Sequence, residues 1–410
     1  MKNHNLNNEP LGSASSLLPK SVQRANIGRL SIAQALAGAN AVVIYATGAI
    51  VGNTLAPAPA LATLPISIFV VGMAACIFPM GALARRYGRR AAFLAGAGAG
   101  VLTGVLAMLA VIAGSFWLFC LATFLGGSYA AVVLSFRFAA ADGVEPSRRA
   151  RALSLVMAGG VVAGVVGPQL VTWTMDIWPL YPFAPTFMAQ AAVAAVSALI
   201  LLGVKLPMPT AEELGGGRPL GLIARQPRFT AAATCGAVSY MLMNFLMTAA
   251  PLAMHLCGHS QASANLGLQW HVIAMYAPSF FTGHLITRFG AVRVAVAGLA
   301  LTGLSAAVGL GGVGGRRFFG WLSLLGVGWG FGFLGASALV LECHRPEEKT
   351  RVQSLNDFIV FGVMAIGSFS SGGLLSAYGW NTVLWVSFLP LVLAAIALAL
   401  TVPKYKGLSV

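Results

Sequence analysis

GALARRYGRR, at Gly81–Arg90, is the stretch that decides the fold, and a degenerate copy, GHLITRFG, stands at Gly283–Gly290. The copies lie 202 residues apart and share two glycines and an arginine: Gly81, Arg86 and Gly88 match Gly283, Arg288 and Gly290. A motif repeated at such a distance indicates that one half of the chain duplicates the other.

A second set of residues repeats at an offset of 200: Asp142, Pro146, Arg151 and Ser154 recur as Glu342, Pro346, Arg351 and Ser354. Two similar units in tandem, each rich in apolar sequence, are typical of transporters whose halves rock against each other.

The composition indicates a membrane protein, because 58% of the 410 residues are hydrophobic and only 9% are charged. The net charge of +15 does not indicate nucleic-acid binding, since the basic residues lie in short loops between apolar runs and form no single patch. The five cysteines show no CxxC spacing, so neither a zinc or redox motif nor a disulfide framework is predicted.

We predict an all-α membrane protein with twelve transmembrane helices in two six-helix halves. The apolar segments are 30–50, 61–82, 91–113, 116–138, 152–174, 185–204, 229–250, 264–284, 291–311, 318–340, 352–376 and 381–402. The predicted domains are an N-terminal tail (1–26), a first bundle (27–204), a linker (205–228), a second bundle (229–402) and a C-terminal tail (403–410).

Lysines and arginines set the predicted orientation. The tails and the even-numbered connections carry 23 of the 25 basic residues, and the other side carries only Arg316 and Arg317. Because cytoplasmic loops are rich in Lys and Arg, both termini are expected on the cytoplasmic side of the membrane. The N-terminal sequence has no apolar core of its own and is not expected to be a secretory signal.

The GALARRYGRR loop resembles the motif between helices 2 and 3 of the major facilitator superfamily, with GHLITRFG as its second copy. The resemblance covers all twelve predicted helices and implies the major facilitator fold. One departure is at the usual acidic position of the motif, which holds Arg85 here and Thr287 in the second copy. Asp142 and Glu342 are the expected replacement partners for the loop arginines.

These loop charges are predicted to hold the cytoplasmic gate shut in one state. The alternative is a set of solvated surface pairs, each contributing only about 0–1 kcal/mol. The predicted gating residues are Arg86, Arg89, Arg90, Asp142, Arg151, Arg288, Glu342, Arg351 and Asp357.

Asp357 is the acidic residue that falls inside a predicted helix. Its nearness to Arg351 favours a gate salt bridge, with a proton carrier as the alternative. Proton-driven drug exporters of this superfamily place an Arg in helix 4 near the position of Thr123, and Gly160–Leu170 only faintly resembles their helix 5 motif. Proton-driven export is therefore poorly supported.

Soft metal ligands concentrate in Met241–Met275, which holds five of the 14 methionines where an even distribution would place about one. Met243 with Met247, and His271 with Met275, are spaced four residues apart, so each pair shares a helix face. On consecutive helices the two pairs could converge on one ion, and thioether sulfur suits Cu(I) rather than Mg²⁺ or Ca²⁺. Packing alone is the alternative, since Met fills gaps between apolar helices.

The connection between these two helices could guide metal to the site, or it could hold ordinary loop residues. No HExxH motif or paired carboxylates accompany it, so no enzyme activity is predicted. The candidate access residues are Met254, His255, Cys257 and His259.

MxxxM followed by HxxxM in the next helix resembles the CcoA-type copper importers, a major facilitator branch that supplies copper for cytochrome oxidase assembly. The resemblance implies copper import from periplasm to cytoplasm by alternating access, with copper as substrate and no cofactor. The implied partners are the copper ion, the lipid bilayer, a periplasmic copper donor and a cytoplasmic acceptor, but no nucleic acid. The implied ligands are Met243, Met247, His271 and Met275.

Two other functions fit the same sequence. One is transport of a small organic solute, including proton-coupled efflux, with the methionines as apolar lining. The other is a non-transporting membrane receptor or assembly factor, against which the paired gate motifs argue because a static scaffold needs no two-state latch.

The predicted orientation can be tested with reporters. A reporter fused after Val410 should be active only as a cytoplasmic marker, and a tag inserted within 176–184 should be reachable from the periplasm. A periplasmic C-terminus would contradict the twelve-helix assignment.

Overall fold

A computed structural model describes residues 18–58, 61–207, 217–256, 261–312 and 315–401. Every regular element in these ranges is helical. The elements are α1 (Lys20–Leu55), α2 (Leu64–Tyr87), α3 (Arg89–Ala113), α4 (Phe116–Ala141), α5 (Pro146–Ala158), α6 (Gly160–Thr174), α7 (Ala184–Leu202), α9 (Leu220–Ala224), α10 (Pro227–Leu256), α11 (Gln261–Tyr276), α12 (Ser279–Phe289), α13 (Ala291–Leu310), α14 (Gly315–Val340), the 3₁₀ turn η2 (Pro346–Glu348) and α15 (Lys349–Thr401).

The predicted all-α membrane fold is confirmed. Within the described ranges, eleven stretches are long and apolar enough to cross a membrane. The remaining predicted span, 264–284, consists of α11 and α12, which meet at Pro278, a residue without the N–H that a continuous helix needs. The last two predicted spans both lie in α15, whose helical geometry breaks at Gly379 with φ 77° and ψ 175°.

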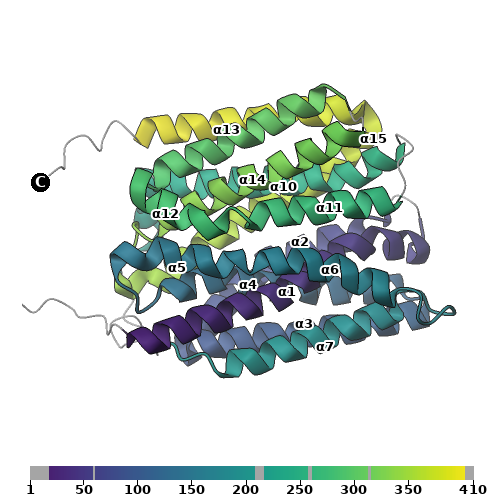
Figure 1. The fold of residues 1–410 in the computed structure, drawn as a ribbon, viewed down its shortest axis with the longest axis horizontal. Coiled ribbons are helices and arrows are strands. Elements are labelled where there is room, and N and C mark those ends of the chain that lie inside the picture. Colours follow the sequence, from purple (N-terminus) through teal and green to yellow (C-terminus); the bar gives the residue numbers. More distant parts are fainter. Residues whose placement is uncertain (1–17, 59–60, 208–216, 257–260, 313–314, 402–410) are drawn as a thin grey trace, which may run out of the picture.

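The first helix of each half begins before the predicted start of its bundle, which was 27 for the first half and 229 for the second. The first half, α1 to α7, begins at Lys20, and the second half, α10 to α15, begins at Pro227. We call the end of the molecule where α1 begins and α15 finishes the terminal end; it lies at the left of Figure 1.

The linker between the halves is docked at the terminal end. Ile223 of α9 is buried against the second half, and Arg218 forms a double hydrogen bond with the Glu348 carboxylate, Nε to Oε1 at 2.7 Å and Nη2 to Oε2 at 2.6 Å. This bonding to the carboxylate raises the pKa of Arg218 above its usual value, so the pair stays ionised.

Glycine allows the helices of each half to approach closely. A side chain added at Gly72 of α2 would collide with the Phe124 carbonyl oxygen of α4, and one added at Gly127 of α4 would collide with the Phe69 carbonyl oxygen of α2. Membrane helices have no hydrophobic drive to associate within lipid, so contacts of small residues carry much of their packing.

The repeated loop motif has the same conformation in both halves. Gly88 joins α2 to α3 with φ 85° and ψ 159°, and Gly290 joins α12 to α13 with φ 86° and ψ 151°. Residues with a Cβ rarely adopt this backbone region, which explains why glycine occupies both positions.

The first glycine of each copy contacts the opposite half at the terminal end. A Cβ on Gly81 of α2 would collide with Ser354 of α15, and a Cβ on Gly283 of α12 would lie 2.8 Å from the Arg151 Cα and 3.0 Å from the Ser154 Cβ of α5. Ser154 and Ser354 are themselves counterparts in the repeat. The duplicated elements therefore cross reciprocally, α2 on α15 and α12 on α5.

The α2–α4 contact predicts a stability effect at Gly127. Gly127→Ala should lower the melting temperature of the purified protein, because overpacking against backbone costs about 1–3 kcal/mol. Gly98→Ala is the matched control, since Gly98 of α3 has no atom within 4 Å of its added Cβ. Equal melting temperatures for the two variants would contradict the close approach of α2 and α4.

Candidate functional site

A cavity lies between the two halves, and residues of both halves line it. None of the described residues that line it is acidic, Lys or Arg. Its walls come from α1, α2 and α4 of the first half and from α10 and α11 of the second: Gln34, Ala37, Gly38, Ala41, Val42, Tyr45, Phe69, Met73, Ala130, Val133, Leu134, Tyr240, Met243, Asn244, Met247, Leu268, His271, Val272, Met275 and Tyr276.

The structure brings all four predicted copper ligands to this one cavity. Met243 and Met247 project from α10, and His271 and Met275 from α11. Across the described chain, no group of three or more His, Cys, Asp or Glu residues is placed to hold a metal ion. The four predicted access residues, Met254, His255, Cys257 and His259, lie outside the residues whose side chains are described.

Aromatic rings occupy the space between the cavity and the terminal end. Tyr240 packs edge-on against Trp329, Phe333 and Phe361, with ring centroids 5.4, 5.1 and 5.6 Å away. Tyr276 also packs edge-on against Trp329 at 5.3 Å. These edge-to-face contacts are favourable, and the layer bounds the cavity on this side with apolar area.

A buried ion pair, which the sequence prediction missed, lies beside the aromatic layer. Arg137 Nη2 of α4 is 2.6 Å from Asp357 Oδ1 of α15, with side-chain exposures of 0% and 4%. The guanidinium also lies over the rings of Phe138 and Phe333, at 4.2 and 4.6 Å from their centroids. Asp357 was expected to pair near Arg351, but its partner is Arg137 of the opposite half. Arg137 lies at the end of the apolar run 116–138, where a single arginine is normally assigned to the following loop. Its position in the sequence therefore did not identify it as a partner of Asp357.

Three of the other predicted gating charges, Arg89, Asp142 and Glu342, form ion pairs at the terminal end. Arg89 Nε is 2.7 Å from Asp142 Oδ2 within the first half, and Lys349 of the second half approaches the same carboxylate at 3.8 Å. Arg89 Nη2 also donates to Gln353 Oε1 across the interface at 2.6 Å.

The second predicted acidic partner, Glu342, pairs with Arg228 at the start of α10. Arg86 and Arg288 each lie over the aromatic ring of the next residue, Tyr87 and Phe289. Three further predicted gating residues, Arg90, Arg151 and Arg351, also lie at the terminal end, on α3, α5 and α15.

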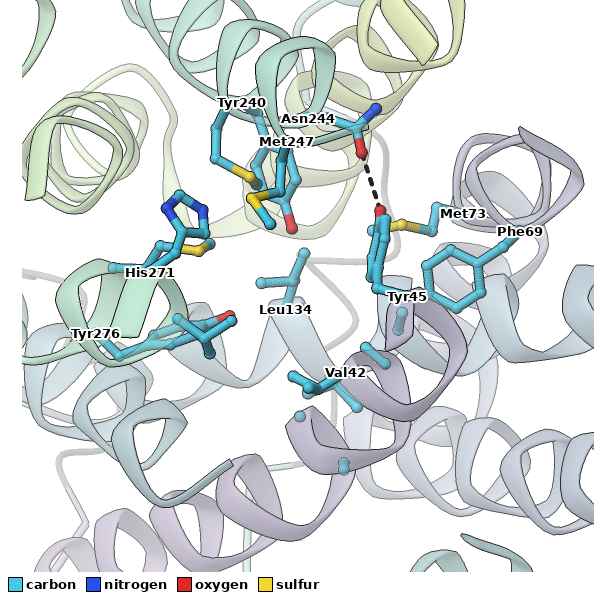
Figure 2. Close-up of a pocket in the computed structure, with 18 of the residues that line it drawn as sticks. Val42, Tyr45, Phe69, Met73, Leu134, Tyr240, Asn244, Met247, His271 and Tyr276 are labelled. Atoms are coloured by element: carbon cyan, nitrogen blue, oxygen red, sulfur yellow. Dashed lines mark hydrogen bonds between the residues drawn. The ribbon is translucent and has the colours of Figure 1, made fainter. Parts of the chain in front are cut away.

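Three buried polar atoms of the cavity lining have no hydrogen-bond partner within the described residues. They are Gln34 Oε1, Asn244 Nδ2 and His271 Nε2. The other polar atoms of two of these side chains are engaged: Tyr45 Oη donates to Asn244 Oδ1 at 3.0 Å, and His271 Nδ1 lies 2.8 Å from the Leu322 carbonyl. Figure 2 shows Tyr45, Phe69 and Met73 on one side of the cavity and His271 and Tyr276 on the other.

Comparisons with known proteins identify the family. The sequence matches the family described as the Major Facilitator Superfamily over residues 30–264 and again over 232–409. The riboflavin transporter RfnT of Brucella anthropi is 46% identical over 387 residues, which span 94% of this chain and 97% of that protein. The uncharacterised transporter YdeG of Bacillus subtilis is 29% identical, with 86% of each chain covered.

Solved structures share the fold at low sequence identity. The proton:xylose symporter XylE aligns with a TM-score of 0.75 at 14% identity, covering 94% of this chain and 97% of that one. The human organic anion transporter MFSD10 aligns with a TM-score of 0.71 at 16% identity, covering 93% and 100%. The transporter FucP in its outward conformation aligns with a TM-score of 0.69 at 15% identity, covering 92% and 98%.

The prediction of copper import, and with it the resemblance to CcoA-type importers, is wrong. The 46% identical relative spans nearly the whole chain and is a riboflavin transporter, not a copper importer. Methionines at i and i+4 on neighbouring helices also occur where helices line an apolar cavity. The MxxxM and HxxxM spacings therefore did not distinguish a metal site from a cavity lining.

The predicted superfamily is confirmed, because the family match covers almost the entire chain and the fold agrees with it. This chain therefore belongs to the Major Facilitator Superfamily, and it is a multi-pass membrane transporter rather than an enzyme.

Proposed function

We propose that this protein transports riboflavin, or a flavin of closely similar structure, across the membrane by alternating access. The observation that carries the proposal is the 46% identity to a riboflavin transporter over 94% of the chain. At that identity and coverage, the relative is similar to this chain over nearly its whole length.

The chemistry of the cavity supports this substrate. Riboflavin joins a flat, uncharged aromatic ring system to a hydroxylated side chain. Tyr45, Phe69, Tyr240 and Tyr276 line the cavity, and none of its described lining residues is Lys, Arg, Asp or Glu, which suits an uncharged aromatic ring. The few polar groups, such as Gln34 and Asn244, can orient the solute without a fixed charge.

We also propose a location and an orientation: a bacterial inner membrane, with both termini in the cytoplasm. The distribution of basic residues supports the orientation. With that orientation, the halves are joined at their cytoplasmic end, and the cavity belongs to the state that receives solute from the periplasmic side.

In this proposal the polar contacts between the halves near the terminal end form the gate. Arg137–Asp357 and Arg89–Gln353 both cross from the first half to the second. For the cavity to open toward the cytoplasm, α4 and α15 must separate, and the Arg137–Asp357 pair must then exchange its partner for water. A buried pair favours the closed arrangement only while both members are present.

Transport can be measured as counterflow in proteoliposomes, which detects a carrier whichever way it works in the cell. Radiolabelled riboflavin should accumulate in vesicles preloaded with unlabelled riboflavin. Asn244→Leu should reduce the rate about tenfold or more, because it removes a polar anchor in the cavity and leaves the Tyr45 hydroxyl unpaired. Met247→Leu should retain much of the rate, since Leu for Met is a mild packing change. No counterflow of riboflavin by the intact protein would contradict the proposal.

The gate predicts a conformational effect of Asp357→Asn. Removing one partner of a buried pair costs about 3–5 kcal/mol, so the closed state should lose population. Ser135 lies in a small second cavity that Asp357 and Arg89 also line. In a protein without other cysteines, Ser135→Cys should react faster with a thiol reagent when Asp357→Asn is also present.

The matched control for the gate is Glu145→Gln. Glu145 and Arg148 form an ion pair at 3.9 Å with both side chains more than half exposed, and such pairs contribute about 0–1 kcal/mol. Unchanged labelling at position 135 in Asp357→Asn would show that the buried pair does not hold this end shut.

A further inference from the structure

The imidazole of His271 has its two nitrogens in different settings. Nδ1 lies 2.8 Å from the carbonyl oxygen of Leu322 in α14, and a carbonyl oxygen can only accept a hydrogen bond. Nδ1 must therefore carry a hydrogen. The ring is 1% exposed, and no carboxylate is among the described residues that line the cavity, so the neutral form is favoured. In neutral imidazole the other nitrogen, Nε2, is then a pure acceptor.

The Nε2 acceptor is buried and has no partner within the described part of the chain. Buried polar atoms in native structures are almost always hydrogen-bonded, so an orphaned acceptor on a cavity wall calls for a donor that is absent from the empty protein. The neighbouring lining residues Met243, Met247 and Met275 offer thioethers, which are weak acceptors and cannot supply that hydrogen.

The backbone around His271 is held in place by close helix contacts. A Cβ added at Gly326 of α14 would lie 2.6 Å from the His271 carbonyl oxygen, and one added at Gly330 would lie 2.6 Å from that of Met275. With α11 pressed against α14 and Nδ1 bonded to Leu322, the ring has little freedom to turn Nε2 away. The acceptor is therefore preorganised.

We propose that His271 Nε2 accepts a hydrogen bond from a ring N–H of a lactam or imide in the transported solute. This inference rests on the proposed function: in oxidised riboflavin, the ring system has a single N–H, placed between two carbonyl groups. His271 is then a specificity-determining residue that distinguishes flavins with a free imide from those alkylated at this nitrogen.

The surroundings favour the ring N–H over a side-chain hydroxyl of riboflavin as the donor. Met243, Met247, Met275 and Tyr276 line the same cavity as His271, and thioethers and aromatic rings pack against a flat aromatic surface. The hydrogen-bonded pair Tyr45 and Asn244 lies across the cavity from His271 (Figure 2), where it can serve the hydroxylated chain. The two ends of the solute thus meet walls of different polarity.

Binding of two flavins to the purified protein in nanodiscs tests the assignment without any mutation. Riboflavin has the imide N–H, and 3-methylriboflavin carries a methyl group in its place. We expect the methylated flavin to bind roughly 10- to 100-fold more weakly, because it leaves the buried acceptor unpaired. The same ratio is expected for lumiflavin against 3-methyllumiflavin, which lack the hydroxylated chain.

A variant series separates hydrogen bonding from steric exclusion of the methyl group. His271→Phe keeps a ring but removes the acceptor, so the affinity ratio of riboflavin to 3-methylriboflavin should fall to about one. His271→Gln restores an acceptor and should recover part of the ratio. Met364→Leu, on α15 and outside the cavity lining, should keep the full ratio.

The outcomes distinguish this inference from the proposed function. If the intact protein binds riboflavin and 3-methylriboflavin equally, or if His271→Phe keeps the full ratio, the role of His271 is overturned while riboflavin transport stands. If the intact protein binds no riboflavin, the proposed function falls, and the assignment of His271 falls with it.

Discussion

The reciprocal crossing of the two halves at the terminal end is the contact on which the rest of the structure depends. Gly81 of α2 meets Ser354 of α15, and Gly283 of α12 meets Ser154 of α5, where the Gly283 N–H donates to the Ser154 hydroxyl at 3.0 Å. Because these glycines and serines are counterparts in the repeat, one duplicated contact made twice joins the halves. A contact of this kind closes one end of the molecule and leaves a cavity between the halves further along the helices.

Between this contact and the cavity lie first a buried ion pair and then a layer of aromatic rings. Beyond the glycine contacts comes the Arg137–Asp357 pair, and beyond the pair come the rings of Tyr240, Phe333 and Trp329. Taking two charges out of water is unfavourable, so such a pair seldom adds stability over apolar packing. It is well suited to a two-state role, because its partners are satisfied either by each other or by water, and no intermediate separation satisfies both.

The sequence predicted most of the fold, because apolar runs of about 20 residues must be helical in a bilayer and the loop motif repeats visibly. It did not reveal Arg137, whose partner lies 220 residues away and is found only when α4 and α15 are packed together. It did place Met243, Met247, His271 and Met275 on two adjacent helix faces, and the structure brings them to one cavity. The spacing could not identify the substrate. Metal ligands on one helix face and residues that line a cavity recur at the same helical period.

The distinction between a metal site and a solute site lies in what remains unpaired. A copper site of this kind would use the methionine sulfurs and a histidine nitrogen together, with no need for other donors. In this cavity the unpaired atoms are spread out instead: an amide oxygen at Gln34, an amide nitrogen at Asn244 and an imidazole nitrogen at His271. These three atoms come from three helices, α1, α10 and α11, and the cavity is otherwise lined mainly by apolar, aromatic and thioether groups. In our proposal, the histidine that suggested a metal ligand instead accepts a hydrogen bond from an organic ring.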